Sequence, residues 1–271
     1  MDSDTQGRPA DRWQLGNPYE RYVGRWSRRV APAFVSWLAL PAGLRWLDVG
    51  CGTGALCAAI ADQAAPASLT GVEPSDGFLA LARETLSRRA QWLQGHAAAL
   101  PLADASVDVV VSGLVLNFVP DLRAALAEAA RVAAPGATFG AYVWDYAGRM
   151  DLMRHFWDAA QALDAAAAAL DEGVRFPLCR PDALRAQLAD AGCRDPQVTA
   201  IDVPTRFADF DDYWTPFLGG QGPAPSYAMS LDDAARSRLR DALRRRLPTA
   251  ADGSIDLVAR AWAVRAMLPT A

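Results

Sequence analysis

Histidine and cysteine are scarce in this chain of 271 residues. It has two histidines, His96 and His155, and its four cysteines include no Cys-x-x-Cys pair. Structural zinc sites need four such ligands at regular spacing. We therefore expect no metal centre.

An excess of positive charge is also lacking. The formal net charge is -4 at pH 7, so no overall positive field could hold a phosphate backbone. Short arginine clusters at residues 25–29 and 244–246 are typical of solvated helix faces. Nucleic acid is therefore not expected as a partner.

Long hydrophobic stretches are absent as well. No run approaches 18 uninterrupted apolar residues, and residues 1–13 are polar and acidic where a signal peptide would be basic and then apolar. We expect a cytoplasmic protein without a membrane partner, whose thiols stay reduced. The composition, 52% hydrophobic and 21% charged, is that of a globular protein; it does not indicate the oligomeric state.

The first half of the chain alternates apolar runs with helical patterns. Five runs are expected to be strands, at residues 45–49, 69–73, 91–94, 107–112 and 138–144. Four helices are expected between and before them, at residues 27–40, 55–65, 75–89 and 122–134. Such alternation predicts a parallel sheet covered by helices on both faces.

Local signals support the ends of two of these helices. Ser27 is a plausible N-cap for the first one, and Pro41 follows its end. Pro135 and Gly136 follow the helix at 122–134, as helix stop signals usually do.

The second half has a different pattern. It predicts helices at 151–170 and 181–191, a strand at 198–203, an aromatic-rich helical stretch to residue 247, and a last strand at 257–267. The alanine run at 165–169 is interpreted as helix, because alanine is the best helix former.

The strongest motif is LDVGCGTG at residues 47–54, a strand that runs into a glycine-rich turn and then a helix. Glycines there let the backbone approach a ligand at a helix N-terminus. The same residues also fit the G-x-G-x-x-A form of a dinucleotide fingerprint. Asp48 favours another ligand, because its carboxylate would repel a pyrophosphate but suits an ammonium group. Glu73, after the second strand, can accept from both ribose hydroxyls in either case.

With these residues the chain resembles the class I S-adenosylmethionine-dependent methyltransferases, of the subgroup that includes ubiquinone- and menaquinone-biosynthesis enzymes. The matching segments are LDVGCGTG at 47–54, GVEPSDGFLALAR at 71–83, GHAAALPLADASVDVVVSGLVLNFVPD at 95–121 and ARVAAPGA at 130–137. The resemblance implies an α/β, Rossmann-like doubly wound sheet of order 3-2-1-4-5-7-6 with strand 7 antiparallel, and S-adenosylmethionine as cofactor. It also implies one domain at 27–271, with a lid segment at 1–26 and helical acceptor-side insertions at about 146–180 and 205–252.

The resemblance assigns cofactor contacts in four groups. Asp48, Gly50, Cys51 and Gly52 line the methionine end, while Glu73 holds the ribose. Pro74, Ser75, His96, Ala97 and Ala98 edge the adenine, and Gly113, Leu114 and Asn117 end the fourth strand beside the methyl group. Tyr22 and Arg25 are expected near the methionine carboxylate or the acceptor.

His96 departs from the family pattern, which has Asp at this position to accept from the adenine amino group. A neutral imidazole keeps one acceptor nitrogen, whereas a protonated one keeps none. The alternative is that His96 points to solvent and that a backbone carbonyl takes over.

The acceptor pocket is expected among the aromatic residues of the N-terminal segment and of the late insertions. Asp145, at the end of its strand, is a candidate to orient or deprotonate the acceptor, and Tyr22 is a second candidate; Asp145 could equally cap a turn. An ordinary buried helix face would also explain the aromatic spacing. The predicted acceptor-binding residues are Trp26, Asn117, Trp144, Tyr146, Trp157, Tyr213 and Trp214.

The sequence thus predicts methyl transfer to a small molecule by in-line displacement, with a quinone or another aromatic natural product as acceptor. Such a transfer mainly needs positioning and exclusion of water, so a general base is optional. Two alternatives remain open: a methyltransferase acting on RNA or protein, and a non-catalytic S-adenosylmethionine-binding regulatory protein.

Overall fold

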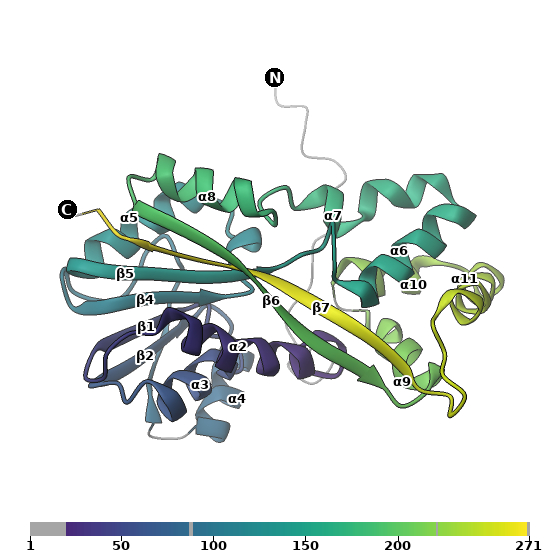
Figure 1. Cartoon of the computed structure of the whole chain (residues 1–271), viewed down its shortest axis with the longest axis horizontal. Coiled ribbons are helices and arrows are strands. Elements are labelled where there is room, and N and C mark those ends of the chain that lie inside the picture. Colours follow the sequence, from purple (N-terminus) through teal and green to yellow (C-terminus); the bar gives the residue numbers. More distant parts are fainter. Residues whose placement is uncertain (1–19, 87–88, 221, 270–271) are drawn as a thin grey trace.

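The computed structural model describes residues 20–86, 89–220 and 222–269. Its centre is a seven-stranded sheet of order β3-β2-β1-β4-β5-β7-β6 (Figure 1). All neighbouring strands are parallel except β7, which runs antiparallel to β5 and β6. This is the expected fold class and strand order. The strands are β1 (Arg45–Val49), β2 (Ser68–Glu73), β3 (Gln91–Gln94), β4 (Val107–Gly113), β5 (Ala133–Trp144), β6 (Arg194–Phe207) and β7 (Ile255–Met267).

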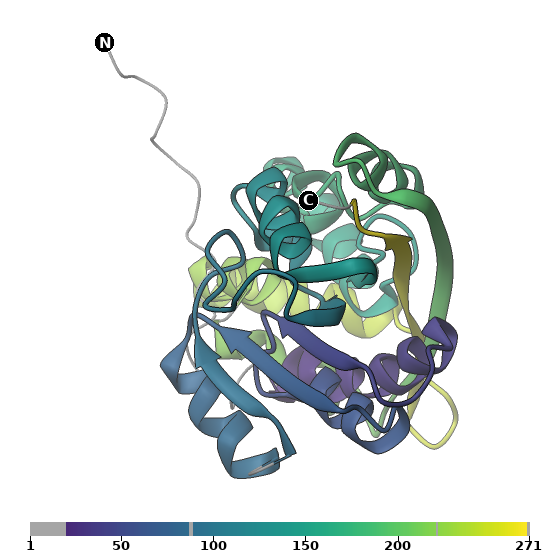
Figure 2. The same ribbon diagram turned by 90° about the vertical axis from the view of Figure 1, so that its left-hand side faces the viewer.

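Helices cover both faces of the sheet, as Figures 1 and 2 show. On one side lie α2 (Arg25–Leu38), α3 (Ala55–Gln63) and α4 (Asp76–Leu86), and on the other α5 (Leu122–Val132) and α8 (Pro181–Asp190). The central strand β4 is therefore buried on both sides, and Val109, Val110 and Val111 are 0% exposed. This double burial is why its sequence is apolar at successive positions.

Strands β6 and β7 extend well past the other strands and support the remaining helices (Figure 1). The remaining helices are α6 (Asp151–Leu163), α7 (Glu172–Arg175), α9 (Phe210–Trp214), α10 (Pro223–Ser230) and α11 (Asp233–Arg246). Elsewhere in the described chain lie the short turns η1 (Glu20–Gly24), η3 (Leu116–Phe118), η4 (Ala165–Leu170) and η5 (Thr215–Gly219). In the described ranges, no helix has the length and apolar character needed to span a bilayer.

The first helix starts earlier than its sequence suggests. A π-helical turn leads directly into α2 at Arg25, so Ser27 lies inside the helix, where its hydroxyl donates to the carbonyl of Gly24 at 2.8 Å. The prediction of Ser27 as N-cap is therefore wrong. The helix ends because Ala39 takes a left-handed conformation, φ 49°, which few non-glycine residues adopt.

Two helix predictions extended too far. Helix α5 stops at Val132, and Pro135 and Gly136 lie inside β5 rather than after a helix. The helix predicted at 151–170 ends at Leu163, because Asp164 turns extended and its side chain caps a 3-10 turn by accepting from the N–H of Ala166. The local cap by Asp164 here outweighs the helix propensity of alanine.

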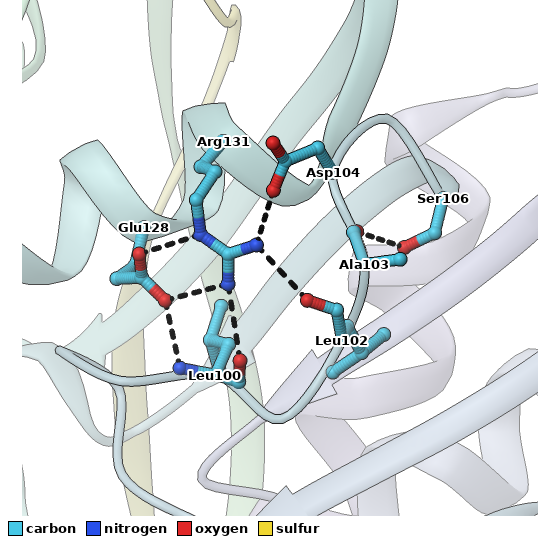
Figure 3. A network of polar contacts seen from close by, with 7 residues as sticks. All are labelled: Leu100, Leu102, Ala103, Asp104, Ser106, Glu128 and Arg131. Atoms are coloured by element: carbon cyan, nitrogen blue, oxygen red, sulfur yellow. Dashed lines mark hydrogen bonds and ion pairs between the residues drawn. The ribbon is translucent and has the colours of Figure 1, made fainter.

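A polar network ties α5 to the loop before β4 (Figure 3). The guanidinium of Arg131 donates to the carbonyls of Leu100 and Leu102 and pairs with Asp104 and Glu128. Glu128 in turn accepts from the N–H of Leu100 at 2.8 Å. One arginine thus fixes the course of a loop that has no regular structure of its own.

Arg131→Ala is expected to lower the free energy of unfolding by about 1–2 kcal/mol, because it removes several charge-assisted hydrogen bonds from a partly buried site. Urea denaturation measures this change. Arg123→Ala, at an exposed position of the same helix, is the matched control and should stay within about 0.5 kcal/mol of the unmodified protein. Equal losses in the two variants would contradict a role for Arg131 in holding the loop.

Candidate functional site

The carboxyl ends of β1, β2, β4 and β5 border one cavity of about 830 Å³. In open α/β sheets this edge is where ligands bind, because the chain crosses over in opposite directions there. The cavity is lined by the glycine turn after β1, by the ends of the next strands and by part of α2.

The glycine turn is fixed by hydrogen bonds to the neighbouring strand. The N–H groups of Gly50 and Cys51 donate to the carbonyl of Val72 at 2.8 and 3.1 Å. Gly50 has φ +74°, and a Cβ there would lie 2.7 Å from a methyl group of Val115. Glycine is therefore required at position 50 by both backbone conformation and packing.

Asp48 lies just below this turn and is 1% exposed. Its Oδ2 accepts from the thiol of Cys57 at 3.2 Å, and its Oδ1 has no hydrogen-bond partner although it is buried. Burial raises the pKa of Asp48 to about 7. A buried carboxylate with a free oxygen at the wall of a cavity is suited to bind a cationic or hydrogen-bond-donating ligand group.

Glu73 ends β2 on the same side of the cavity. Its carboxylate accepts from the N–H groups of Gly52 at 3.1 Å and Ser75 at 3.0 Å. Burial raises the pKa of Glu73, against the opposing effect of these two hydrogen bonds. Each oxygen still has a second lone pair, so the side chain can accept from a diol.

Most of the residues predicted to bind a cofactor line this one cavity. The turn 95–99 brings His96, Ala97 and Ala98 to it, with the N–H of Ala99 donating to the carbonyl of His96 at 3.0 Å. These residues come from four separate stretches of the chain. The predicted residues that line the cavity are Asp48, Gly50, Cys51, Gly52, Glu73, Pro74, Ser75, His96, Ala97, Ala98, Gly113 and Leu114, and on the acceptor side Trp144 and Tyr146.

Four aromatic side chains form one wall of the cavity, called the aromatic wall here. It consists of Phe118, Tyr142, Trp144 and Tyr146. Phe176, from the segment after α7, packs edge-on against Phe118 at 5.1 Å between ring centroids, and at a tilt against Tyr146 at 5.6 Å. Such a wall favours a planar or apolar ligand.

The N-terminal candidates lie outside the cavity lining. Arg25 pairs with Asp212 at 2.8 Å and its guanidinium lies 4.7 Å from the ring centroid of Phe207. Trp26 packs edge-on against that same ring at 5.3 Å. Tyr22 is buried among aromatic rings, and its hydroxyl has no hydrogen bond. Residues 1–19 of the predicted lid lie outside the described part of the chain.

Asp145 caps a turn, which was the structural alternative to a role in catalysis. Its two oxygens accept from the backbone N–H groups of Gly148 and Arg149, each at 3.0 Å, so the side chain caps the turn after β5. Asn117 lies in η3 and does not line the cavity, although its buried amide nitrogen has no partner.

The late aromatic residues pack in the interior of the insertions. Trp157 donates to Glu172, the hydroxyl of Tyr213 donates to the carbonyl of Leu152 at 2.9 Å, and Trp214 packs on Phe217. None of these three aromatic residues lines the cavity. A direct contact of these three side chains with an acceptor was predicted. It stays a prediction, and this geometry gives it no support.

Some residues of the site were not predicted individually from the sequence. Val23 and Ser27 reach the cavity from η1 and α2, and Phe118 and Asp121 reach it from the segment after β4. The last two lie in the stretch 95–121, whose pattern pointed to the region but not to individual side chains. No cluster of three or more metal-ligating side chains occurs in residues 20–86, 89–220 and 222–269.

Comparison with known sequences identifies the region around the cavity. Residues 47–140 match a family model described as a methyltransferase domain. A malonyl-[acyl-carrier protein] O-methyltransferase from Geobacter sulfurreducens is 35% identical over 156 residues, 57% of each chain. A ubiquinone/menaquinone biosynthesis C-methyltransferase from Dinoroseobacter shibae is 38% identical over 109 residues, 38% of this chain and 44% of that protein. The matches thus span about half the length of these relatives.

Solved structures extend the similarity of fold to most of the chain. A proposed methyltransferase of an antibiotic biosynthesis pathway from Anabaena variabilis aligns with a TM-score of 0.60 and 23% identity, over 87% of this chain and 96% of that one. At this identity the alignment establishes the fold alone.

Gly50→Ala is expected to lower the free energy of unfolding by about 3 kcal/mol, since it combines a strained backbone with a clash against Val115. Gly136→Ala is the matched control: Gly136 has φ +81°, but a Cβ there has no neighbour within 4 Å. The control should lose only about 1 kcal/mol. Urea unfolding of both variants compares the losses, and equal values would mean that the contact with Val115 relaxes freely.

Proposed function

Because its residues 47–140 make this chain a class I S-adenosylmethionine-dependent methyltransferase, we propose that it transfers a methyl group to a small-molecule acceptor held against the wall of Trp144 and Tyr146. The observation that carries the proposal is the buried carboxylate of Asp48, whose Oδ1 faces no partner within the protein. The methionine moiety of the cofactor brings an ammonium group of the matching charge.

The rest of the cavity fits the same cofactor. Glu73 has free lone pairs for the two ribose hydroxyls, in the geometry common to proteins that bind a ribose at the second strand. Pro74, Ser75 and Ala97 border the part of the cavity where the adenine would lie. The glycine turn leaves room for close approach of the methionine end.

When bound, the cofactor supplies a methyl group attached to a sulfonium sulfur. That sulfur leaves as a neutral thioether, which is a good leaving group. The protein therefore mainly has to align the acceptor and exclude water. Trp144 and Tyr142, each 2% exposed, provide rigid walls for this purpose. Both oxygens of Asp145 are engaged by backbone N–H groups, and His155 does not line the cavity, so neither is placed to remove a proton.

The choice of a small acceptor rests on the aromatic wall and on the charge of the chain. Four aromatic side chains suit a planar, apolar molecule such as a quinone or another aromatic natural product. A net charge of -4 disfavours RNA, which other methyltransferases modify. Two alternatives remain: a methyltransferase acting on a protein, and a non-catalytic regulatory protein that only binds the cofactor.

Formation of S-adenosylhomocysteine from S-adenosylmethionine, measured with a panel of quinols, phenols, amines and thiols, tests the proposal. Turnover with at least one acceptor is expected, and Asp48→Ala should abolish it at limiting cofactor. Cofactor binding without turnover of any acceptor would favour the non-catalytic alternative. Binding of NAD without binding of S-adenosylmethionine or S-adenosylhomocysteine would overturn the assignment.

The pH dependence of cofactor binding provides an independent check. The pKa of Asp48 is raised to about 7 by burial, so in more acidic solution the free protein carries a proton that must leave before an ammonium group can bind. Affinity should therefore fall as the pH drops from about 8 to about 6.

Asp48→Asn should weaken binding by about 1.5–3 kcal/mol and remove the part of this pH dependence that Asp48 contributes. Calorimetry at several pH values measures both effects. Glu84→Gln, at an exposed position of α4, is the control and should behave as the unmodified protein. An unchanged affinity of Asp48→Asn would show that the ammonium group binds elsewhere.

A further inference from the structure

The turn 95–99 borders the part of the cavity where the proposed function places the adenine, and it lies outside the helices and strands. Its residues 95–98 line the cavity. Within the turn, the N–H of Ala99 donates to the carbonyl of His96 at 3.0 Å, and at its start the N–H of Gly95 donates to the carbonyl of Glu73 at 3.3 Å. The position of the turn also depends on the residues that follow it.

Arg131 holds the segment that follows the turn. From helix α5 its guanidinium donates to the carbonyl of Leu100 at 3.1 Å and to that of Leu102 at 3.0 Å (Figure 3). Glu128, one helical turn earlier, accepts from the N–H of Leu100 at 2.8 Å and from the guanidinium at 2.7 and 2.8 Å. Both backbone polar groups of Leu100 are therefore bound by side chains of α5, and the planar fork of the guanidinium makes this geometry specific.

Pro101 connects this network to the turn by direct packing. It lies between the two residues whose carbonyls Arg131 binds. A Cβ on Gly95 would lie 2.8 Å from the Cδ of Pro101 and 3.1 Å from its Cγ, so the proline ring rests against Gly95. The ring also fixes the φ angle of Pro101. Since Gly95 lines the cavity, a chain of contacts leads from Arg131 to the cavity wall.

Helix α5 also holds the far end of this segment. The N–H groups of Ala105 and Ser106 donate to the carbonyls of Arg131 and Val132 at 3.0 and 2.8 Å. Asp104 pairs with the guanidinium at 2.6 Å from the solvent side, where its own side chain is 78% exposed. The segment 100–106 is thus attached to α5 at both ends, and the turn 95–99 continues from it to the cavity.

The composition of the turn makes its position important. Residues 97–99 are all alanines, so at these positions only backbone groups can form hydrogen bonds with a base. A backbone group cannot adjust by rotating a side chain, and hydrogen bonds weaken steeply when their distance and angle depart from the preferred range. Recognition of a base by this turn therefore requires contacts that hold the chain in place.

Arg131 is not among the described residues that line the cavity. We propose that it is a positioning residue for the cofactor: through Leu100 and Pro101 it holds the turn 95–99 where the backbone of the turn can bind the edge of the adenine. This inference rests on the proposed function, because it concerns the adenine end of the same cavity. Without Arg131 the turn should lose its hold on the base, while Asp48 and Glu73 keep their places at the other end of the cofactor.

Calorimetry on the full chain with S-adenosylhomocysteine and S-inosylhomocysteine tests the inference. In the inosine compound a carbonyl replaces the amino group of the adenine, whereas the ribose and the amino acid part are the same. The unmodified protein is expected to bind the adenosine compound about tenfold more tightly, as expected when a hydrogen bond to the base is lost. Arg131→Ala should lower the affinity for S-adenosylhomocysteine about tenfold and that for the inosine compound by less than about threefold.

Two control variants separate positioning from a general loss of stability. Asp104→Ala removes the outer ion pair of Arg131 but leaves its bonds to the two carbonyls, so the affinity should stay unchanged. Gly136→Ala strains a backbone position outside the cavity lining and should also leave the affinity unchanged. If Arg131→Ala does not fold, Pro101→Ala takes its place, because it removes the contact with Gly95 and keeps the arginine; it should weaken binding of S-adenosylhomocysteine about threefold.

The inference is wrong if the folded variant keeps its affinity for S-adenosylhomocysteine, or if it loses affinity for both compounds equally. It is also wrong if either control loses as much affinity as Arg131→Ala, or if the unmodified protein does not prefer the adenosine compound. In all these cases the proposed function stands. If the unmodified protein does not bind S-adenosylhomocysteine, the proposed function itself fails.

Discussion

The structure depends on a carboxylate buried where a parallel strand ends. Asp48 occupies the end of β1, with the glycine turn above it and Cys57 of α3 beside it. This position excludes ligands that bring negative charge to the turn, since they would meet an unscreened anion. In a protein that binds a dinucleotide at the same turn, the residue at the position of Asp48 must be uncharged. Both ligand classes can therefore bind at a turn of the same backbone conformation. The side chain at position 48 determines which of the two binds.

Much of the fold follows from patterns that the sequence displays locally. The strands β1, β2, β3 and β4 were predicted within about one residue, because apolar runs bounded by glycine or by polar residues leave few alternatives. The failures occur where distant contacts determine the conformation. Pro135 and Gly136 lie in a strand because β5 pairs with β4 on both sides of them, Ala133 with Val107 and Thr138 with Val109, across a register shift. The alanines after Asp164, by contrast, form a 3-10 turn for a local reason, because the Asp164 side chain accepts from the N–H of Ala166 at its start.

The site shows the same division between local and distant information. Asp48 and Glu73 were accessible to sequence analysis because the motif and the spacing of strands bring them to one edge. The 95–98 turn was assigned only through the resemblance to the methyltransferase family. Arg25 was not, since its partner Asp212 lies 187 residues away in the chain. Glu172 gave no signal, because a single acidic residue in a polar stretch is typical of a surface position. In the structure it is 1% exposed, and the indole N–H of Trp157 donates to its carboxylate.

The attachment of the late helices has a consequence for how such proteins diversify. Helices α6, α9, α10 and α11 pack on one another and on β6 and β7, and β1, β2 and β3 lie at the opposite end of the sheet order. Insertions or replacements in these helices therefore leave the strands of the cofactor half and their order unchanged. The peripheral module can vary in sequence and length with little cost to the half that carries the methyl donor.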